Sequence, residues 1–550
     1  MAKTRIIAAA VALAFAGSAY AGVVTLDGHH LTMDQAWEVA NGQSTVEIAP
    51  SARQNLILSH KLVMEAAAQG KPVYGLTTGV GLNKDKKLFD ANGKLTKEVL
   101  DASRAFNYNA FRAHSAGIGP MMPENLARLS MVIRLNTMLA GQSGAQVRVA
   151  DLYREFLNKH ITPEIPSRGT IGEADILLAS HVGSVMIGEW RARVDGRLMS
   201  GAEALKAKGI TPLVPEGKDA LAVLSNSSVA MAYALDGYKK ALQVTKTTPV
   251  VFGLSLEGLN GNVAPFLPQT VAVRPFPGLD KAAESLRLSL KGSYLWQPAK
   301  DRPLQDPLSY RTTVYALAEA NNALADLKKV IDVQINAGDD NPATILNAKQ
   351  DYRSESKQVA NYFIDGKEVN GAIIPSANFE VLPVALALQR ASLAVAHLSH
   401  NAVQRTIHLS DEHFTGLTRF LTAPGNKGHA FGAIQKAFMG MHVDTMALAQ
   451  PVSLYGMPVA GDIEDTFTQL LQAGQRLGQI AENTRYVYGL ELLHGAQAID
   501  LRRQKSGNFA MSSDTAKLYN AFRKVSPYVD RDRQFTDDIE NAAKLIGSWN

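Results

Sequence analysis

A glycine-rich loop in the first hundred residues combines a tyrosine with backbone groups that could bind an anion. It reads Tyr74-Gly-Leu-Thr-Thr-Gly-Val-Gly81. The loop lacks the Lys-Ser/Thr pair of a P-loop and the glycine spacing of a dinucleotide fingerprint, so it does not predict nucleotide binding. Tyr74 accepts a proton at neutral pH only if helix N-termini or cations lower its pKa from the usual value near ~10. Otherwise it is a packed aromatic residue with a hydrogen-bonded hydroxyl.

Metal and thiol chemistry are not expected. The chain contains no Cys, which excludes disulfides, thiolate metal ligands and a cysteine nucleophile. His397 and His400 are three residues apart, but they lie in an apolar helical pattern without nearby carboxylates, so we expect core histidines and no metal cofactor. Arg311 carries a planar guanidinium, which suits two-point binding of a carboxylate, with a structural salt bridge as the alternative.

The composition is that of a globular chain that can bury a large core. Its 550 residues are 46% hydrophobic and 19% charged, and length alone indicates two to four domains. The net charge is +5 without long runs of one sign, so no nucleic acid partner is expected. The apolar stretch 382–403 is interrupted by Gln389, Arg390 and His397, so we expect no stable membrane insertion.

The first 21 residues have the pattern of a secretory signal peptide. Lys3 and Arg5 precede an apolar run at 6–15, and Ala19-Tyr-Ala21 supplies a cleavage site of small residues. A short N-terminal core helix is the alternative. This pattern predicts that residues 1–21 are removed and that the protein is periplasmic or secreted. The absence of Cys is consistent with export.

Long helical patterns indicate a mainly α protein. Residues 311–333, 382–406, 430–450 and 464–493 carry apolar side chains at spacings of three and four, several of them on more than one face, as in a buried bundle. The first half shows shorter helices and loops. We therefore expect a loop-rich helical active-site region over 22–215, a central long-helix bundle over 216–505 and a C-terminal helical tail over 506–550.

Eight blocks in order resemble the histidine and phenylalanine ammonia-lyase family. The first is the loop at 74–81, with Thr77 where the family has Asn. The others are Ala113-His-Ser-Ala-Gly-Ile-Gly119, Ile165-Pro-Ser-Arg-Gly-Thr-Ile-Gly172, Lys218-Asp-Ala-Leu-Ala-Val-Leu224, Gln305-Asp-Pro-Leu-Ser-Tyr-Arg311, Asp340-Asn-Pro342, Ala377-Asn-Phe379 and Glu491-Leu-Leu-His-Gly-Ala-Gln-Ala-Ile-Asp-Leu-Arg502. The resemblance, over 26–502, implies a mainly α long-helix bundle of the ammonia-lyase or fumarase-like type. It also implies a homotetramer whose active sites combine loops from three subunits.

The sequence departs from the family at the electrophilic prosthetic group. Family enzymes make a methylidene-imidazolone by cyclising Ala-Ser-Gly, and here that place holds Glu173-Ala174-Asp175. Ala174 has no hydroxyl to lose and Asp175 carries a side chain where the cyclisation needs glycine, so no such group, and no other cofactor, is expected. Leu308 also replaces a family Tyr, with Tyr310 two residues on.

The remaining matches imply roles in substrate binding. Tyr74 matches the base that removes the β proton, and Arg311 matches the residue that binds the carboxylate. His114 and Asp444 favour an imidazole-like head group, the alternatives being an interior histidine and a helix-surface charge. Other positions match the pocket, or serve only packing: Gln305, Phe379, and Ser225 with Asn226, where the family has one Asn.

Acidic residues replace the electrophile. The resemblance places Glu173 and Asp175 where helix N-termini converge, and their positive ends would keep carboxylates ionised. They would hold a cationic leaving group, and Glu380 would add to the same acidic pocket. The alternative is that Glu173 and Asp175 only cap helices.

These features predict an elimination that needs no electrophile. A trimethylammonium group already carries a positive charge and leaves as neutral trimethylamine, as in ergothionase-like members of the family that lack the prosthetic group. We therefore expect a small-molecule lyase that acts on a histidine-type betaine and yields an aryl acrylate. The alternatives are a catalytically inactive periplasmic binding protein of the same fold and a lyase that expels another leaving group.

Overall fold

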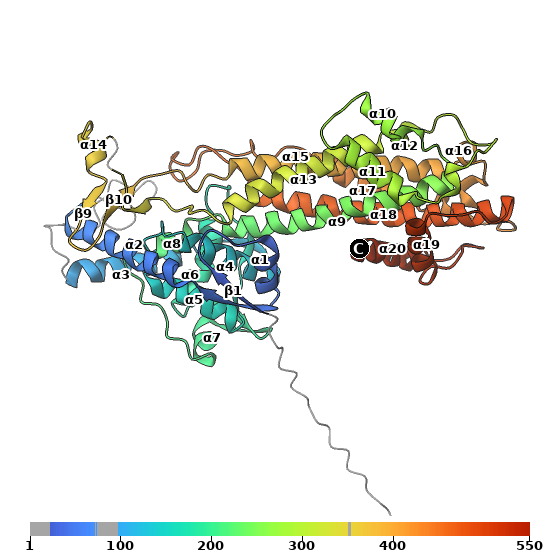
Figure 1. The fold of residues 1–550 in the computed structure, drawn as a ribbon. Helices are drawn as coiled ribbons and strands as arrows, with labels where there is room; N and C mark the ends of the chain where they lie inside the picture. Colours follow the sequence, from blue (N-terminus) through green and yellow to red (C-terminus); the bar gives the residue numbers. More distant parts are fainter. Residues whose placement is uncertain (1–21, 72, 74–96, 350–351, 353, 550) are drawn as a thin grey trace, which may run out of the picture.

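The protein is a mainly helical bundle with a smaller helical layer at one end (Figure 1). The computed structural model describes residues 22–71, 73, 97–349, 352 and 354–549, so Tyr74 and the predicted signal peptide lie outside the described residues. The long bundle helices are α9 (Ser228–Leu259), α13 (Thr313–Gln334), α15 (Leu382–Leu409), α17 (Gln435–Leu448) and α18 (Leu470–Ser506). The mainly α fold expected from the sequence is confirmed.

Glycines let the two longest helices approach closely. A Cβ on Gly474 of α18 would lie 2.8 Å from the backbone nitrogen of Ala234 in α9, and one on Gly237 would lie 2.8 Å from the carbonyl oxygen of Gly474. Real Cβ contacts do not come so close, so only glycine fits at these crossings. Inside the bundle, Arg405 and Glu491 form a fully buried ion pair at 2.6 Å.

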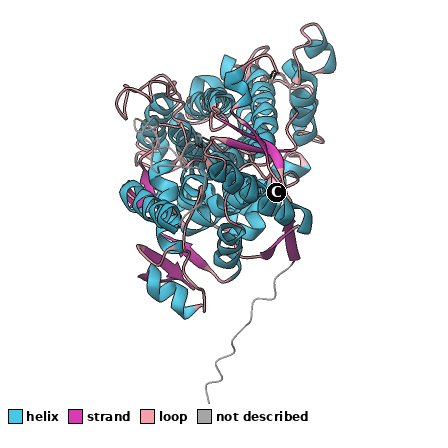
Figure 2. Ribbon diagram, turned by 90° about the vertical axis from the view of Figure 1, so that its left-hand side faces the viewer, coloured by secondary structure: helices cyan, strands magenta, loops and turns pink. Residues whose placement is uncertain are grey.

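The end layer precedes α9 in the chain. It contains α1 (Met33–Ala40), α2 (Pro50–Ala68), α3 (Lys97–His114), α4 (Glu124–Leu139), α5 (Val147–Asn158), α6 (Ile176–Met186), α7 (Gly201–Ala207) and α8 (Asp219–Leu224). Among the described residues the strands form four small sheets at the periphery (Figure 2). Two sheets have two strands each: β1 (Gly22–Leu26) with β2 (Ser44–Ile48), and β3 (Ile118–Met121) with β5 (Pro166–Arg168). In the third sheet β6 (Arg191–Val194) lies between β4 (Ile161–Pro163) and β7 (Arg197–Ser200), and in the fourth β10 (Asn370–Ile374) lies between β8 (Ala343–Leu346) and β9 (Phe363–Asp365).

Short helices and the C-terminal segment cover the other end of the bundle (Figure 1). These are α10 (Pro268–Ala272), α11 (Leu279–Ser289), α12 (Leu308–Arg311), α16 (Glu412–Thr415), α19 (Ser513–Arg523) and α20 (Thr536–Ser548), while α14 (Lys357–Ala360) lies beside β9 and β10. Glu257 of α9 anchors the segment before α19, because its carboxylate accepts hydrogen bonds from the Ser512 amide and the Thr515 hydroxyl.

Two expectations about the helices need correction. The sequence reading placed only shorter helices in the first half, whereas α9 runs unbroken for 32 residues with Pro249 inside it. Its apolar residues lie on several faces because α18, α15, α13 and α4 all pack against it, which weakens the one-sided periodicity. His397 is exposed and not a core residue, while His400 is half-buried with its ring 5.2 Å from that of His442.

One described helix, α15, is long and apolar enough to cross a membrane. Over half of its most apolar window is buried in the bundle, as in the core helix of a packed protein. The helices α13 and α18 pack against this buried part of α15.

Candidate functional site

Three acidic segments meet at the end of the bundle that faces the smaller layer. The backbone of Glu173 pairs with that of Glu380 in an antiparallel bridge. Residues 468 and 469, just before α18, close over the same loop, because their amides donate to the Ile171 carbonyl at 3.2 and 3.0 Å. The Thr468 hydroxyl also donates to the Gly172 carbonyl at 2.7 Å. The loop therefore lies between the start of α15 and the start of α18.

Among the described residues, the two charged side chains that shift the pKa of Glu173 are both acidic. Burial, and then the charges of Glu380 and Glu464, raise the pKa of Glu173 from 4.5 to about 7. Its Oε1 is buried and has no hydrogen-bond partner among the described residues. Since a buried carboxylate needs compensation, this arrangement favours a cation or a bound proton.

Asp175 directly precedes α6 in the chain and is fully buried, with its side chain against the start of α9. Its Oδ2 accepts a hydrogen bond from the Ala230 amide at 2.8 Å, while its Oδ1 has no partner among the described residues. Burial raises the pKa of Asp175 from 3.8 to about 7, although the hydrogen bonds from Ala230 and Thr170 oppose the shift. The carboxyl of Asp175 therefore gains or loses its proton near neutral pH, beside the positive end of the α9 dipole.

Asn226 is used by the fold itself. Its Oδ1 accepts from the Ser228 amide at 3.0 Å and its Nδ2 donates to the Val223 carbonyl at 2.7 Å, with the residue fully buried. The side chain therefore caps α9, with its oxygen and its nitrogen each in one hydrogen bond to the backbone. Ser225, beside it, is also buried.

Phe379 and Glu380 belong to the segment that leads into α15. Phe379 is half-buried, and its carbonyl accepts a 3.4 Å hydrogen bond from the Ser227 hydroxyl. Glu380 is exposed, and its Oε1 accepts from the Leu382 amide at 2.6 Å. Glu380 therefore caps α15 while its backbone holds Glu173.

Arg311 lies in a different part of the subunit, on α12 near the far end of the bundle from α6 and α8 (Figure 1). Its Nε donates to the Asp306 carbonyl at 2.8 Å, and the residue is half-buried. Gln305 and Leu308 are exposed on the same segment. Tyr310 is fully buried with its hydroxyl 3.0 Å from that of Ser255, so it is a packing residue and cannot take the place of the family tyrosine.

The two residues predicted to bind the head group, His114 and Asp444, lie on different helices, α3 and α17. His114 ends α3 with its Nδ1 2.8 Å from the Ala110 carbonyl, and the next residue, Ser115, contacts Ser184 of α6 at 2.8 Å. Asp444 is exposed on α17. One subunit thus holds the acidic residues and Arg311 in two separate groups, and their meeting in one site stays a prediction.

Glu464 is the acidic residue that sequence reasoning missed. It lies in the loop before α18, half-buried, and pairs through its backbone with Val459. The sequence pattern had placed 464 inside a helix, whereas α18 begins at Leu470. A helix that starts later leaves Glu464 free to approach Glu173, and the acidic run Asp462, Glu464 and Asp465 was the available signal.

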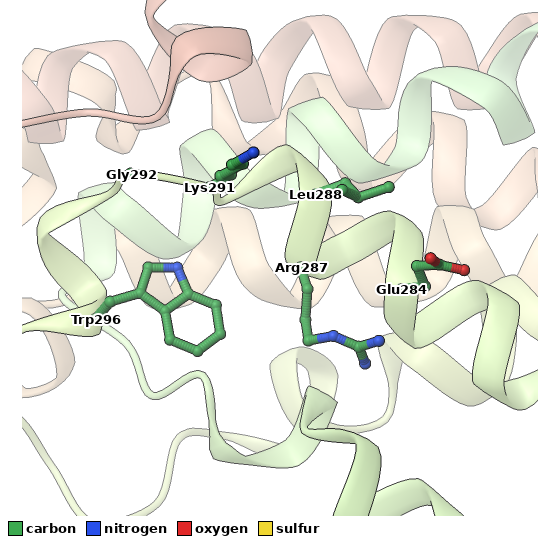
Figure 3. Close-up of a pocket in the computed structure, with 6 residues that line it drawn as sticks. All are labelled: Glu284, Arg287, Leu288, Lys291, Gly292 and Trp296. Carbon is green, nitrogen blue, oxygen red and sulfur yellow. The ribbon is translucent and has the colours of Figure 1, made fainter.

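A separate surface pocket contains none of these residues. It has a volume of about 480 Å³ and is lined from α11 to the turn at Trp296 (Figure 3). Two of its lining side chains bond to the backbone of the protein itself, because Arg287 donates to the Phe266 carbonyl and the Trp296 indole donates to the Leu290 carbonyl. Among the described residues, no group of three or more His, Asp or Glu side chains could hold a metal ion.

Comparison with known proteins places the chain in a family. Residues 31–524 match the aromatic amino acid lyase family. Histidine ammonia-lyase from Chloroflexus aurantiacus is 30% identical over 530 residues, which cover 95% of this chain and 96% of that protein. Histidine ammonia-lyase from Treponema denticola is 29% identical over 529 residues, with 96% and 97% covered. The chain belongs to the aromatic amino acid lyase family and is a carbon–nitrogen lyase.

Solved structures agree with the fold. Ergothionase from Treponema denticola, crystallised with desmethyl-ergothioneine sulfonic acid, has a TM-score of 0.85 and 34% identity, covering 96% of this chain and 99% of that one. Tyrosine aminomutase from Streptomyces globisporus has a TM-score of 0.79 at 26% identity, covering 95% and 96%. Both extend over nearly the whole length of the chain.

Proposed function

We propose that this lyase eliminates trimethylamine from a histidine-type betaine, such as ergothioneine or hercynine, to give an aryl acrylate. The observation that carries the proposal is the meeting of Glu173, Glu380 and Glu464, with no cation among the described residues whose charges act on Glu173. Such a cluster would bind a fixed positive charge. The similarity to ergothionase, whose structure contains an ergothioneine derivative, supports the same substrate class.

We further propose that no methylidene-imidazolone forms. The residues do not fit it, because Ala174 has no hydroxyl, and the side chain of Asp175 is buried against the start of α9. Primary amines leave poorly without such an electrophile. A quaternary ammonium has no lone pair to react with one and needs none, so the substitution of acids for the tripeptide is consistent with the proposed substrate.

The proposed reaction assigns each group a separate task. Arg311 binds the carboxylate with its planar guanidinium. Tyr74 takes the β proton, the C–H electrons form the C=C bond, and the C–N electrons leave with neutral trimethylamine. Glu173 and Asp175, with Glu380 and Glu464, hold the trimethylammonium group before it leaves.

His114 and Asp444 are proposed to bind the imidazole or thioimidazole ring. In one subunit the two residues lie on different helices, α3 and α17, and Arg311 lies on a third, α12. The proposal therefore includes a homotetramer, the assembly typical of the family, in which each site combines groups from several subunits. A small molecule is then the only partner required besides further copies of the chain.

We also propose that the chain is exported and that the mature protein starts after Ala21. Mass spectrometry of the protein from a periplasmic fraction tests this. A mature N-terminus at Gly22 is expected, and an uncleaved N-terminus in the cytoplasm would contradict export.

The function is tested by incubating the mature protein with ergothioneine, hercynine or histidine. Acrylate absorbance and trimethylamine are then measured together. We expect equal amounts of both from at least one betaine and no ammonia from histidine. Tight binding of a betaine without turnover would indicate the binding protein, and ammonia release from histidine would contradict the absence of the electrophile.

A further inference from the structure

The start of α9 is held by two carboxylates that come from different loops. Asp175 accepts from the Ala230 amide at 2.8 Å, and Asp339 accepts from the Ser227 amide at 3.2 Å through its Oδ2. The Ser228 amide between them is capped by Asn226. The unpaired amides of the first turn are therefore shared among these side chains.

The two carboxylates differ in how their charge is balanced. Asp339 is buried and its Oδ1 accepts from Arg134 Nη1 at 2.8 Å. Arg134 also donates to Asp340 at 2.7 Å and to the Ala222 carbonyl at 2.8 Å, and it is itself fully buried. In the part of the chain that the structure describes, Asp175 forms no ion pair, and the negative charge of Asp339 helps to raise its pKa.

We propose that Asp339, held by Arg134, is a positioning residue that fixes the start of α9 and controls the charge of Asp175. The inference rests on the proposed function, because it concerns the seat of the trimethylammonium group. Asp339 does not contact the ligand in this proposal. It acts through its hydrogen bond to the start of α9 and through its charge. Burial raises the pKa of Asp339 to about 6, and the charge of Arg134 opposes that shift, so Asp339 is ionised at neutral pH and held in place. Of the two carboxylates at the helix start, Asp175 is the one with an oxygen that has no partner among the described residues.

The neighbouring Asp340 provides an internal control. It shares Arg134 with Asp339, but its Oδ2 has no partner and its side chain is not hydrogen-bonded to α9. Asp340→Asn therefore removes the same charge from the buried cluster without touching Ser227. Asp538→Asn is a remote control, because Asp538 forms a two-point ion pair with Arg533 at the start of α20.

The test follows unfolding against pH, which does not require turnover. We expect Asp339→Asn to shift the acid-to-neutral transition associated with Asp175 by about half a pH unit or more towards acid, by loss of a like charge. Asp340→Asn and Asp538→Asn should lower stability without that shift. In an Asp175→Asn background, only the transition of Asp339 itself should remain, and Asp339→Asn should remove it. Equal shifts for Asp339→Asn and Asp340→Asn would overturn the proposal.

Activity gives a second readout if the proposed function holds. The pH profile of kcat/KM should move with the unfolding transition in Asp339→Asn and stay in place in Asp340→Asn. Should Asp339→Asn fail to fold, Asp339→Glu keeps the charge but displaces it by one methylene. We then expect an unchanged pH transition with kcat lowered about tenfold or more, and an unchanged kcat would overturn positioning. Failure of betaine turnover in the natural protein would refute the function and leave the unfolding result intact.

Discussion

Glu173 and Asp175 lie two residues apart, yet they meet different surroundings. Glu173 is half-buried next to two other acids, whereas Asp175 is fully buried at a helix start. The first is suited to contact a ligand, since one of its oxygens lacks a partner. The second is bound to the fold through α9, so its charge affects both ligand and stability.

Replacing Glu173 by Gln should weaken betaine binding. The change removes one negative charge while keeping the size of the side chain, and a charge contact at a few ångströms in a partly buried site is worth about 2 kcal/mol or more. We expect KM for a betaine to rise about 10- to 100-fold. Steady-state kinetics measure this, with the exposed Glu319→Gln on α13 as control; equal KM values in both variants would contradict a cation site at Glu173.

Asp175→Asn should change how stability depends on pH. In the folded state the pKa of Asp175 is about 7, above 3.8 in the unfolded chain. Below pH 4 both states hold the proton; as pH rises to 7 the unfolded state loses it first, so this group lowers stability by roughly 4 kcal/mol. Asp175→Asn should lack this loss of stability as the pH rises. Urea unfolding at pH 5 and 8 measures it, with Asp280→Asn as the exposed control.

At the scale of elements, the loop at 171–175 depends on its contact with the start of α18. Gly172 has φ +88°, and a Cβ there would lie 2.1 Å from the Thr468 hydroxyl oxygen and 2.6 Å from the Gln469 nitrogen. No side chain fits without moving one segment. The contact therefore sets where Glu173 and Glu464 lie relative to each other.

Gly172→Ala should displace these segments and lower both stability and activity. We expect a loss of about 2–4 kcal/mol, from backbone strain together with steric overlap. Gly209→Ala is the matched control, because Gly209 also has positive φ but nothing within 4 Å of the added Cβ, so only the strain of about 1 kcal/mol remains. Denaturant unfolding compares the two, and equal losses would show that the contact is unimportant.

The sequence predicted the helical class and four of the long helices, because buried helices keep their apolar spacing over many turns. It could not place Glu464, since the start of α18 depends on the contact of Thr468 with Gly172, 296 residues away. Nor could it show that Asn226 caps α9. A match to a family position identifies the residue but not the direction of its side chain.

At the scale of the whole molecule, the subunit separates the acidic residues from Arg311. The acidic loop lies at the start of α9, whereas the segment of Arg311 lies near its end, where the Asn262 amide donates to Asp306. Exposed apolar side chains also lie on α15 and α17, including Leu386, Leu393 and Val443. Both features are consistent with sites completed by further copies.

Mixing two inactive variants should restore activity if the sites are shared. Glu173→Gln and Arg311→Ala each damage a different group, so a mixed tetramer contains some sites in which both groups are intact. At a betaine concentration far below the raised KM, we expect each variant alone to show little activity. The mixture, after unfolding and joint refolding, should recover a measurable fraction at the same concentration. No recovery in assembled mixed tetramers would contradict shared sites.

The length of α9 limits where residues can be inserted into the subunit. Its 32 residues form a rod of about 48 Å, with the acidic loop at its start and the segment of Arg311 near its end. Two copies aligned antiparallel would place opposite ends together twice, giving one complete site for each chain. In that arrangement, an insertion of one turn in α9 alone would put both sites out of register at once, whereas an insertion in a surface loop would leave both in place.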